Sequence, residues 1–332
     1  FYSTEGTRYA YPTSFYRIRL GLSTIADDGQ ELYDEMYLEH PNFEQLPDLE
    51  TYIRSCRSFV DYMIELKKAP LLNESYSGPV LIEKMALAES FQDKFFKNSL
   101  MAQRAQIASP EMRYYNANTG GNDMELMLGK KVTSRSLTIT SLSGSQEYKG
   151  IKLDGYYPVD GEGVVPDKEL VLVENGVLRN MLNGRTPTKK IQKSNGHSRM
   201  QQTVPGNLML SSNNTCSNVD LKQELIDAAK EEDLEYAYIV RRLRGDNILA
   251  AYQVDVNTGE EKLMRGVRIP DFNQRSFKRV LAASEQNFVY NTTSFGPLVT
   301  YIVPEALLFE ELEVTRNNQI SFKQPFVIPQ PF

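Results

Sequence analysis

The sequence predicts an α+β protein, with helices and short strands in the first third and then a large, mostly antiparallel β domain. Two observations predict this class. Apolar residues recur at helical spacing between residues 49 and 70, whereas from about residue 126 short apolar or alternating runs are separated by Gly, Asn and Asp. The 332 residues are 41% hydrophobic and 24% charged, a balance typical of globular proteins.

The first third begins with extended chain. Residues 16–22 alternate as a strand, and Asp27-Asp28-Gly29 is a turn signal before a second, Tyr-rich extended stretch. A helix is then predicted up to Ala69-Pro70, because one set of residues shares a helical spacing. Its apolar positions are Leu49, Ile53, Cys56, Val60, Met63 and Ile64. Cys56 is expected in the core, where free cysteines are common.

A second helix is expected after a linker over residues 73–79. It extends from about residue 81 to 108, with Phe91, Phe95 and Phe96 on or near its buried side.

The remaining chain is dominated by predicted strands, with one helix among them. The strands are expected at 137–140, 170–173, 177–182, 207–210, 236–243, 248–256, 262–269, 288–290, 299–303, 308–314 and 320–328. Asn175-Gly176 favours a tight hairpin because it adopts positive φ at low cost. The helix is predicted over 220–233, opened by Asp220 with Gln223 three residues later, like a capping box.

Charge and composition exclude several classes of protein. The net charge is −6, so nucleic acid is a poor default partner, since phosphate backbones need a basic surface. No apolar run approaches the ~18 residues of a membrane-spanning helix. Cys56 and Cys216 form neither a disulfide framework nor a CxxC motif. His40 and His197 are the only histidines, which nearly excludes a zinc site built from several imidazoles.

One loop gathers carboxylates between glycines. Asp154, Asp160 and Glu162 lie in the run from Asp154 to Gly163, and they are the weak candidates for catalytic residues. Such acids perform acid–base chemistry or hold a hard cation, but the spacing of an EF-hand is absent. The alternative interpretation is a glycine-rich turn with solvated acids.

One stretch is basic and contains no acid. Residues 179–199 hold six cations: Arg179, Arg185, Lys189, Lys190, Lys193 and Arg199. Arg185, Lys189 and Arg199 are candidates for holding the carboxylates of a peptide. The alternative is a solvated loop that balances an acidic protein. His197 lies alone in this stretch, and the sequence contains neither a Gly-x-Ser-x-Gly elbow nor a phosphate-binding loop.

Several motifs, in the same order, resemble the TldD/PmbA family, the so-called modulators of DNA gyrase. The run 160–166 (DGEGVVP) followed by 170–178 (LVLVENGVL) is similar to the family signature D-x-E-G-x-P…L-I-E-N-G-V-L. Residues 76–81 (YSGPVL) resemble the entry to the family's C-terminal domain. The motif 128–139, the loop with Asn195-Gly196, the run 205–208 and the turn 3–7 resemble further family segments.

The resemblance implies proteolysis or peptide maturation in the cytoplasm. It places a C-terminal β-rich domain at residues 77–332 and assigns 1–76 to the remainder of an N-terminal or middle α/β region. The family's own N-terminal region is expected to be missing upstream, because the chain opens without methionine.

TldD-type members of the family carry a zinc site, formed by His-Glu-x-x-x-His on a helix and a distal Cys. The corresponding positions here are Glu83, Lys84, Ala88 and, for the Cys, Thr292. Neither histidine nor the Cys is present. The chain therefore resembles the PmbA-type (TldE) members, and we expect no metal and no cofactor.

Two functions from different classes follow. The first is a subunit without its own zinc site, which binds peptide or supports a zinc-bearing TldD-like relative as a homodimer or heterodimer. Strands at 299–303 and 308–312 are candidates for the dimer interface. The second is a hydrolase with a rearranged, metal-independent site that uses the Asp154/Asp160/Glu162 loop.

Overall fold

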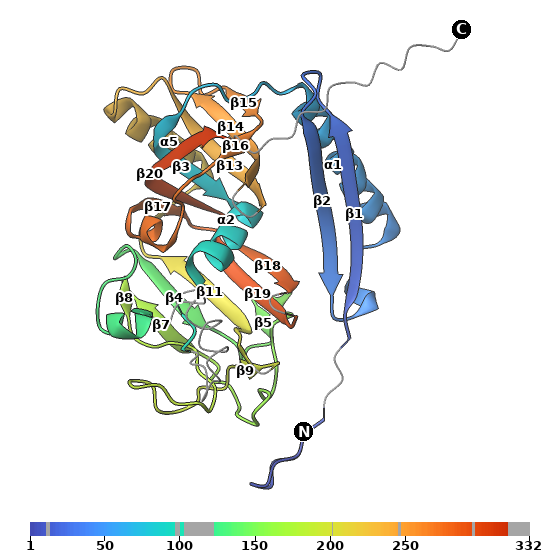
Figure 1. Ribbon diagram of the computed structural model, residues 1–332, viewed down its shortest axis with the longest axis vertical. Coiled ribbons are helices and arrows are strands. Elements are labelled where there is room, and N and C mark those ends of the chain that lie inside the picture. The colour runs from blue at the N-terminus through green and yellow to red at the C-terminus, as the bar shows by residue number, and fades with distance from the viewer. Residues whose placement is uncertain are drawn as a thin grey trace, which may run out of the picture.

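The computed structural model describes residues 1–10, 14–96, 100–102, 123–200, 202–244, 247–293 and 296–317. Within these ranges a layer made of one hairpin and one helix stands beside a larger β-rich body (Figure 1). Most strand pairs in the body are antiparallel, and the long α1 helix lies in the first third. The structure confirms the predicted α+β class.

The hairpin layer comprises residues 16–68. Strand β1 (Tyr16–Ile25) pairs with β2 (Glu31–His40) around the predicted turn, and helix α1 (Leu49–Lys68) follows the 3-10 helix η1 (Phe43–Gln45). The Asp48 side chain begins α1, because its Oδ1 accepts a hydrogen bond from Thr51 N at 2.8 Å.

The apolar face of α1 differs from the prediction. Phe59, Met63 and Leu66 are its buried residues, and they pack on the hairpin. Cys56 is half-buried rather than in the core. The other apolar residues of the predicted stripe are exposed: Leu49, Ile53, Val60 and Ile64. A two-stranded hairpin covers only one narrow face of the helix, so the spacing alone overstated the buried stripe.

Arginines of the body tie the hairpin layer in place. Arg265 is buried and donates to Ala69 O at 2.6 Å and to Asp28 Oδ2 at 2.7 Å, and it also bonds Gln30. Arg242 forms an ion pair with Asp34 at 3.0 Å, and its guanidinium lies 5.0 Å from the ring centroids of both Phe59 and Tyr62.

The upper part of the body in Figure 1 is an eight-stranded sheet in the order β12-β17-β20-β16-β14-β13-β3, with β15 paired to β14. Its strands are β3 (Tyr76–Glu83), β12 (Thr215–Cys216), β13 (Tyr236–Arg244), β14 (Asn247–Asp255), β15 (Glu261–Met264), β16 (Val267–Arg268), β17 (Val280–Ser284) and β20 (Ala306–Arg316). Because β20 also pairs with β3, the path β3-β13-β14-β16-β20 closes into a ring.

The lower part of the body is a six-stranded sheet in the order β18-β19-β11-β4-β7-β8. Its strands are β4 (Leu137–Ser141), β7 (Leu170–Glu174), β8 (Val177–Leu178), β11 (Asn207–Ser212), β18 (Asn287–Thr293) and β19 (Leu298–Pro304). Two small hairpins are added: β5 (Glu147–Tyr148) with β6 (Ile151–Lys152), and β9 (Ser198–Arg199) with β10 (Gln202–Thr203). The short helices are η3 (Asp123–Met127) and η4 (Gln274–Lys278).

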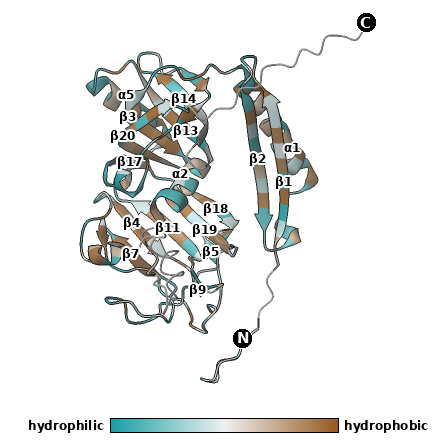
Figure 2. Ribbon diagram, in the orientation of Figure 1, coloured by the Kyte–Doolittle hydropathy of each residue, from teal (hydrophilic) through white to brown (hydrophobic). Residues whose placement is uncertain are grey.

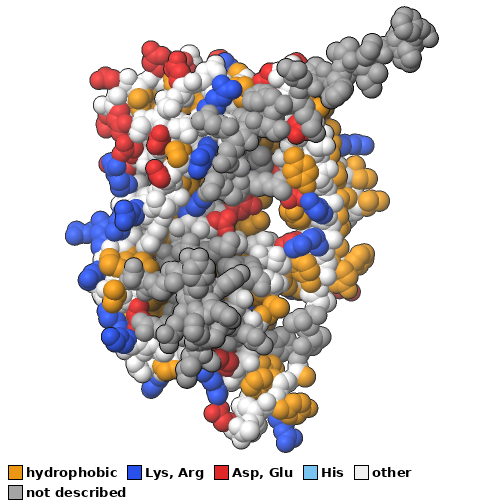
Figure 3. Space-filling model, in the orientation of Figure 1, with side chains coloured by type: hydrophobic (Ala, Val, Ile, Leu, Met, Phe, Trp, Pro, Cys, Tyr) orange, Lys and Arg blue, Asp and Glu red, His pale blue; other side chains and the backbone are white. Residues whose placement is uncertain are grey.

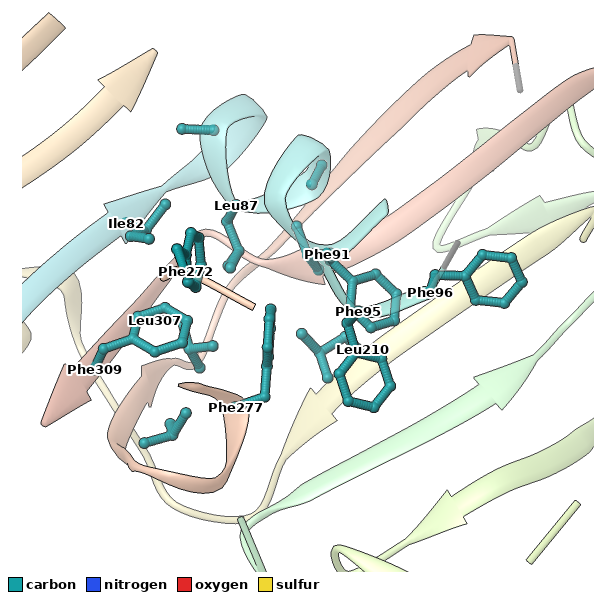
Figure 4. Close-up of a cluster of buried hydrophobic side chains, with 14 of the residues drawn as sticks. Ile82, Leu87, Phe91, Phe95, Phe96, Leu210, Phe272, Phe277, Leu307 and Phe309 are labelled. Carbon is teal, nitrogen blue, oxygen red and sulfur yellow. The ribbon is translucent and has the colours of Figure 1, made fainter. Parts of the chain in front are cut away.

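A helical segment between the two sheets supplies much of the core. Helix α2 (Lys84–Ser90) continues into the π-helix η2 (Phe91–Phe96), whose aromatic rings are buried. Phe277 lies at the centre of this aromatic cluster, with its ring centroid 5.2 Å from that of Phe95 and 5.4 Å from that of Phe309 (Figure 4). Figure 2 shows hydrophobic residues along the strands of both sheets that face this segment.

Several predicted elements differ from the structure. Residues 76–83 form β3 rather than a linker and helix start, because the strand lies between β13 and β20. A strand buried on both faces has a continuous apolar run, which periodicity cannot distinguish from a helix. Helix is found only over 84–96, and the predicted continuation lies mostly outside the described residues, as does the strand 320–328.

The C-terminal half departs from the prediction in two places. Helix α5 (Asn218–Glu231) begins two residues early, because the Ser217 side chain, not Asp220, accepts the capping bond. The candidate interface strands at 299–303 and 308–312 are largely buried inside β19 and β20.

We predict that Phe277→Ala lowers the free energy of unfolding by about 3–5 kcal/mol, since it leaves a cavity among the aromatic rings. Urea denaturation measures this loss. Leu281→Ala, in the neighbouring strand β17 but 37% exposed, serves as the control and should lose less than about 1 kcal/mol. Equal losses in the two variants would contradict the packing described.

Candidate functional site

A pocket of about 780 Å³ lies where the hairpin layer meets the loops of the β-rich body. Five chain segments form its wall: residues 14–15, residues 41–42, residues between 146 and 161, residues 199–200 and residues 296–298. Rings contribute much of the wall: Phe15, Pro41, Tyr156, Tyr157, Pro158 and Pro297. An apolar wall with few polar groups is typical of small-molecule and peptide-end sites. Figure 3 shows acidic and basic side chains along the boundary between the hairpin layer and the body.

Two strands of the lower sheet hold the loop that carries Asp154. Asp154 N donates to Asn291 Oδ1 at 3.2 Å, and Gly155 N donates to Thr300 Oγ1 at 3.0 Å. Asn291 and Thr300 are themselves hydrogen-bonded at 2.6 Å across β18 and β19. Gly155 is required here, because a Cβ would lie 2.3 Å from Gly206 O. The position of Asp154 is thus set by the sheet.

The Asp154 carboxylate is buried at the pocket wall. The residue is 9% exposed, and its Oδ2 has no hydrogen-bond partner within the described chain. The imidazole of His40 in β2 lies near it, with Nδ1 3.6 Å from Oδ2. Desolvation raises the pKa of Asp154 to about 6, although His40 and Lys152 act in the opposite direction.

The other two acids of the predicted loop have a different environment. Asp160 is fully buried, and its Oδ1 accepts from Glu162 N at 2.9 Å and Val164 N at 2.8 Å, while its Oδ2 accepts from Ser198 N at 3.0 Å. The Glu162 carboxylate accepts from Arg185 N. Both acids therefore organise the loop, and only Asp154 among the three candidates lines the pocket.

The three candidate cations are also separated. Arg199 lines the pocket, where Nη1 donates to Pro205 O at 2.7 Å and Leu298 O at 2.8 Å and the guanidinium lies 4.5 Å from the Tyr157 ring centroid. Arg185 forms an ion pair with Glu5 at 2.7 Å. Lys189 is exposed on the loop, outside the pocket wall.

A buried histidine network lies behind the pocket, and sequence reasoning missed it. His197 Nδ1 is 2.9 Å from Asn195 Oδ1, an oxygen that also accepts from Asn183 N. Nδ1 therefore donates, which leaves Nε2 as an acceptor, 2.9 Å from Ser141 Oγ and 3.1 Å from Ser143 Oγ, and the two hydroxyls lie 2.9 Å from each other. No local signal connects these residues, because more than 50 positions separate Ser143 from His197.

The hydrogen-bonded row of serine, histidine and asparagine is similar to the nucleophile, base and orienting group of a catalytic triad. Here, however, the Ser141, Ser143 and His197 side chains are completely buried, and Ser143 Oγ also accepts from Gly206 N. Burial lowers the pKa of His197 to about 3, so the imidazole is neutral. The network holds the 195–207 segment against β4 rather than presenting a nucleophile to a substrate.

Comparison with known proteins gives the family. The model of the PmbA/TldA metallopeptidase C-terminal domain matches residues 79–316. The chain belongs to this PmbA/TldA family. No protein of curated function matches it by sequence.

Solved structures of PmbA/TldA type share the fold. A proposed modulator of a DNA gyrase from Thermotoga maritima is 21% identical with a TM-score of 0.60, over 90% of this chain and 62% of that one. A similar protein from Bacteroides thetaiotaomicron is 12% identical with a TM-score of 0.57, over 91% and 60% of the two chains. TldE from Thermococcus kodakarensis is 14% identical with a TM-score of 0.55, over 91% and 63%. This chain thus spans about 60% of the length of these proteins.

The positions that the resemblance assigns to a zinc motif do not fit zinc in this chain. Glu83 ends β3 and forms an ion pair with Arg241 at 2.8 Å, and Lys84 is exposed at the start of α2. Ala88 is a fully buried methyl group, and Thr292 Oγ1 lies 3.5 Å from Glu39 Oε2. Zinc prefers Cys sulfur, His nitrogen and carboxylate oxygen, so this donor set does not suit it. The described residues contain no cluster of three or more His, Cys, Asp or Glu that could hold a metal ion.

The described part of this PmbA/TldA chain also contains no helix that is both long and apolar enough to cross a membrane.

The two buried aspartates give opposite predictions for stability. Asp160→Asn should lower the free energy of unfolding by about 1–3 kcal/mol, because an amide nitrogen would replace an acceptor of Ser198 N, Glu162 N or Val164 N. Asp154→Asn should leave stability unchanged or raise it by up to about 1 kcal/mol at pH 7.5, allowing for solvent screening, because it removes a desolvated charge. Chemical denaturation of both variants gives the comparison. A larger loss at Asp154 would contradict the assigned roles.

His197 predicts a pH dependence of stability. Its pKa is lower in the folded state than the ~6.5 of an unfolded chain, so the unfolded state binds the extra proton as the pH falls. The contribution of His197 to the free energy of unfolding is therefore complete above pH ~6.5 and is lost as the pH falls toward 3. Between pH 7.5 and pH 5 the free energy of unfolding should fall by about 2 kcal/mol from this residue. Burial raises the pKa of Glu89 to about 7 and that of Asp154 to about 6, which acts in the opposite direction. Unfolding of the wild type and of His197→Gln at both pH values isolates the His197 contribution, and parallel pH profiles would disprove it.

Proposed function

We propose that this chain acts in proteolysis or peptide maturation as a subunit without its own zinc site, which binds peptide and supports a zinc-bearing TldD-like relative. The proposal rests on the residues at the positions that the resemblance assigns to the zinc ligands. Glu83 is paired with an arginine, Ala88 is a buried methyl group and Thr292 offers a hydroxyl, and this set does not suit zinc. A member of a metallopeptidase-related family with that donor set retains a function through its pocket or its surfaces.

The pocket beside Asp154 supports the peptide-binding part of the proposal. Its wall combines rings with a buried acid and with Lys152 and Arg199, which suits the mixed apolar and charged groups of a peptide. The exposed apolar row on α1 supports association, as homodimer or heterodimer, because an exposed apolar row rimmed by polar side chains is typical of protein interfaces.

The second candidate is a hydrolase that uses the Asp154 loop without a metal. The raised pKa of Asp154 favours it, since a general acid needs a pKa near the working pH. Against it, Asp160 and Glu162 are occupied by backbone donors, so neither of the other two candidate acids lines the pocket.

The test mixes the purified chain with a relative that carries His-Glu-x-x-x-His. We expect light scattering to give a complex, and unfolded casein to be cleaved at least about tenfold faster by the mixture than by either protein alone, with full inhibition by a chelator. The chain alone should be inactive. Chelator-resistant cleavage by the chain alone would favour the hydrolase, and the absence of both a complex and a rate increase would reject the subunit role.

A further inference from the structure

We propose that the pocket binds a primary ammonium group, from a peptide amino terminus or a lysine side chain, on the carboxylate of Asp154. The inference rests on the proposed peptide-binding function and gives the ligand of that same pocket a chemical class.

Asp154 Oδ2 lacks a hydrogen-bond donor among the described residues. This oxygen is also buried. A buried carboxylate oxygen without a donor is unfavourable, and most such oxygens in proteins are paired with a donor or a cation. His40 Nδ1, at 3.6 Å, is too distant for a hydrogen bond. An ammonium group supplies both the charge and the donors that the oxygen lacks.

The sheet holds the Asp154 carboxylate in place. The backbone N–H groups of Asp154 and Gly155 are both held by side chains of β18 and β19, and Asn291 Nδ2 donates to Lys152 O at 3.3 Å. Gly206 lies directly against Gly155 on the other side. A carboxylate on such a backbone loses little entropy when it binds a cation.

The charges and the volume of the remaining pocket wall suit the end of a peptide. Asp154 and Glu147 are balanced by Lys152 and Arg199, so the pocket does not favour a polycation. A single ammonium group followed by the carbonyl oxygens of a peptide matches this pattern. Phe15, Tyr156 and Tyr157 provide ring surface for an apolar side chain and for cation–π contact with the ammonium. The volume of about 780 Å³ accommodates a peptide end.

Calorimetry at pH 7.5 with the full chain tests the proposal. The probes are Phe-Ala-Ala amide, its N-acetyl form, and N-acetyl-Ala-Lys-Ala amide, which offers an ammonium only on its side chain. We expect acetylation of the first probe to weaken binding at least about tenfold, and Asp154→Asn to weaken binding of the free-amine probe by a similar factor.

The matched control is Glu169→Gln, which removes the same charge from an exposed position outside the pocket wall and should change affinity less than about twofold. His40→Gln tests the internal alternative. If His40 were the functional partner of Asp154, its removal would strengthen ammonium binding, whereas an ammonium site that does not involve His40 is left nearly unchanged. Circular dichroism confirms that each variant is folded.

The outcomes are distinct. Binding of the free-amine probe supports the amino terminus as the source, and binding of the lysine probe alone supports the side chain. Equal binding of the free and acetylated probes, an Asp154→Asn variant with unchanged affinity, or no binding of any probe up to millimolar concentration would overturn the proposal. Asp154→Asn should still associate with the zinc-bearing relative. If the wild-type chain associates with the zinc-bearing relative but binds no ammonium probe, this inference alone is rejected. If the wild-type chain binds the probe but does not associate with the relative, the subunit role alone is rejected.

Discussion

The burial of residues 76–96 between the two sheets is the constraint on which the rest of the structure depends. β3 closes the ring of the upper sheet through its pairs with β13 and β20, and the chain then passes directly into α2 and η2. Val80, Ala86, Ala88 and Phe91 are fully buried, so these positions must be apolar. Packing therefore decides which residues this segment tolerates, because a volume change in a core packed to crystal-like density costs several kcal/mol.

The same packing bears on the positions that the resemblance assigns to a zinc motif. Ala88 occupies a site without solvent contact, where an imidazole would need both volume and hydrogen-bond partners. Glu83, at the end of the same strand, belongs to a charge network with Arg241, Glu261 and Lys222. Hydrogen bonds and charges within that network raise the pKa of Arg241 and lower that of Glu261, so the network stabilises its own charges and Glu83 is engaged in the ion pair with Arg241.

The elements that sequence reasoning predicted well are those whose signal is local. The turns at Asp27–Gly29 and Asn175-Gly176 follow from residues that tolerate positive φ, and both are found in the structure. β3 was misassigned because its burial comes from β13 and β20, which lie more than 150 residues later in the chain. The same limit applies to the site. Residue type alone makes Asp154 and Arg199 candidates. The different roles of the two aspartates depend on contacts from distant parts of the chain, because Ser198 N binds the Asp160 carboxylate whereas Asn291 binds only the backbone N–H of Asp154. The partnership of His197 with Ser141 is also non-local.

The pocket exists only while the hairpin layer is attached to the body. Ser14, Phe15, Pro41 and Asn42 form one side of its wall, and these residues adjoin the ends of β1 and β2 that lie farthest from the Arg265 contacts. Arg265 holds the turn of the hairpin, Arg242 holds its middle, and His40 lies opposite Asp154 at its far end. Any ligand that bridges Asp154 and the hairpin wall therefore adds a further attachment between the hairpin and the body. By thermodynamic linkage, a ligand that binds only the attached state must stabilise it, so the hairpin layer and the pocket form one binding unit.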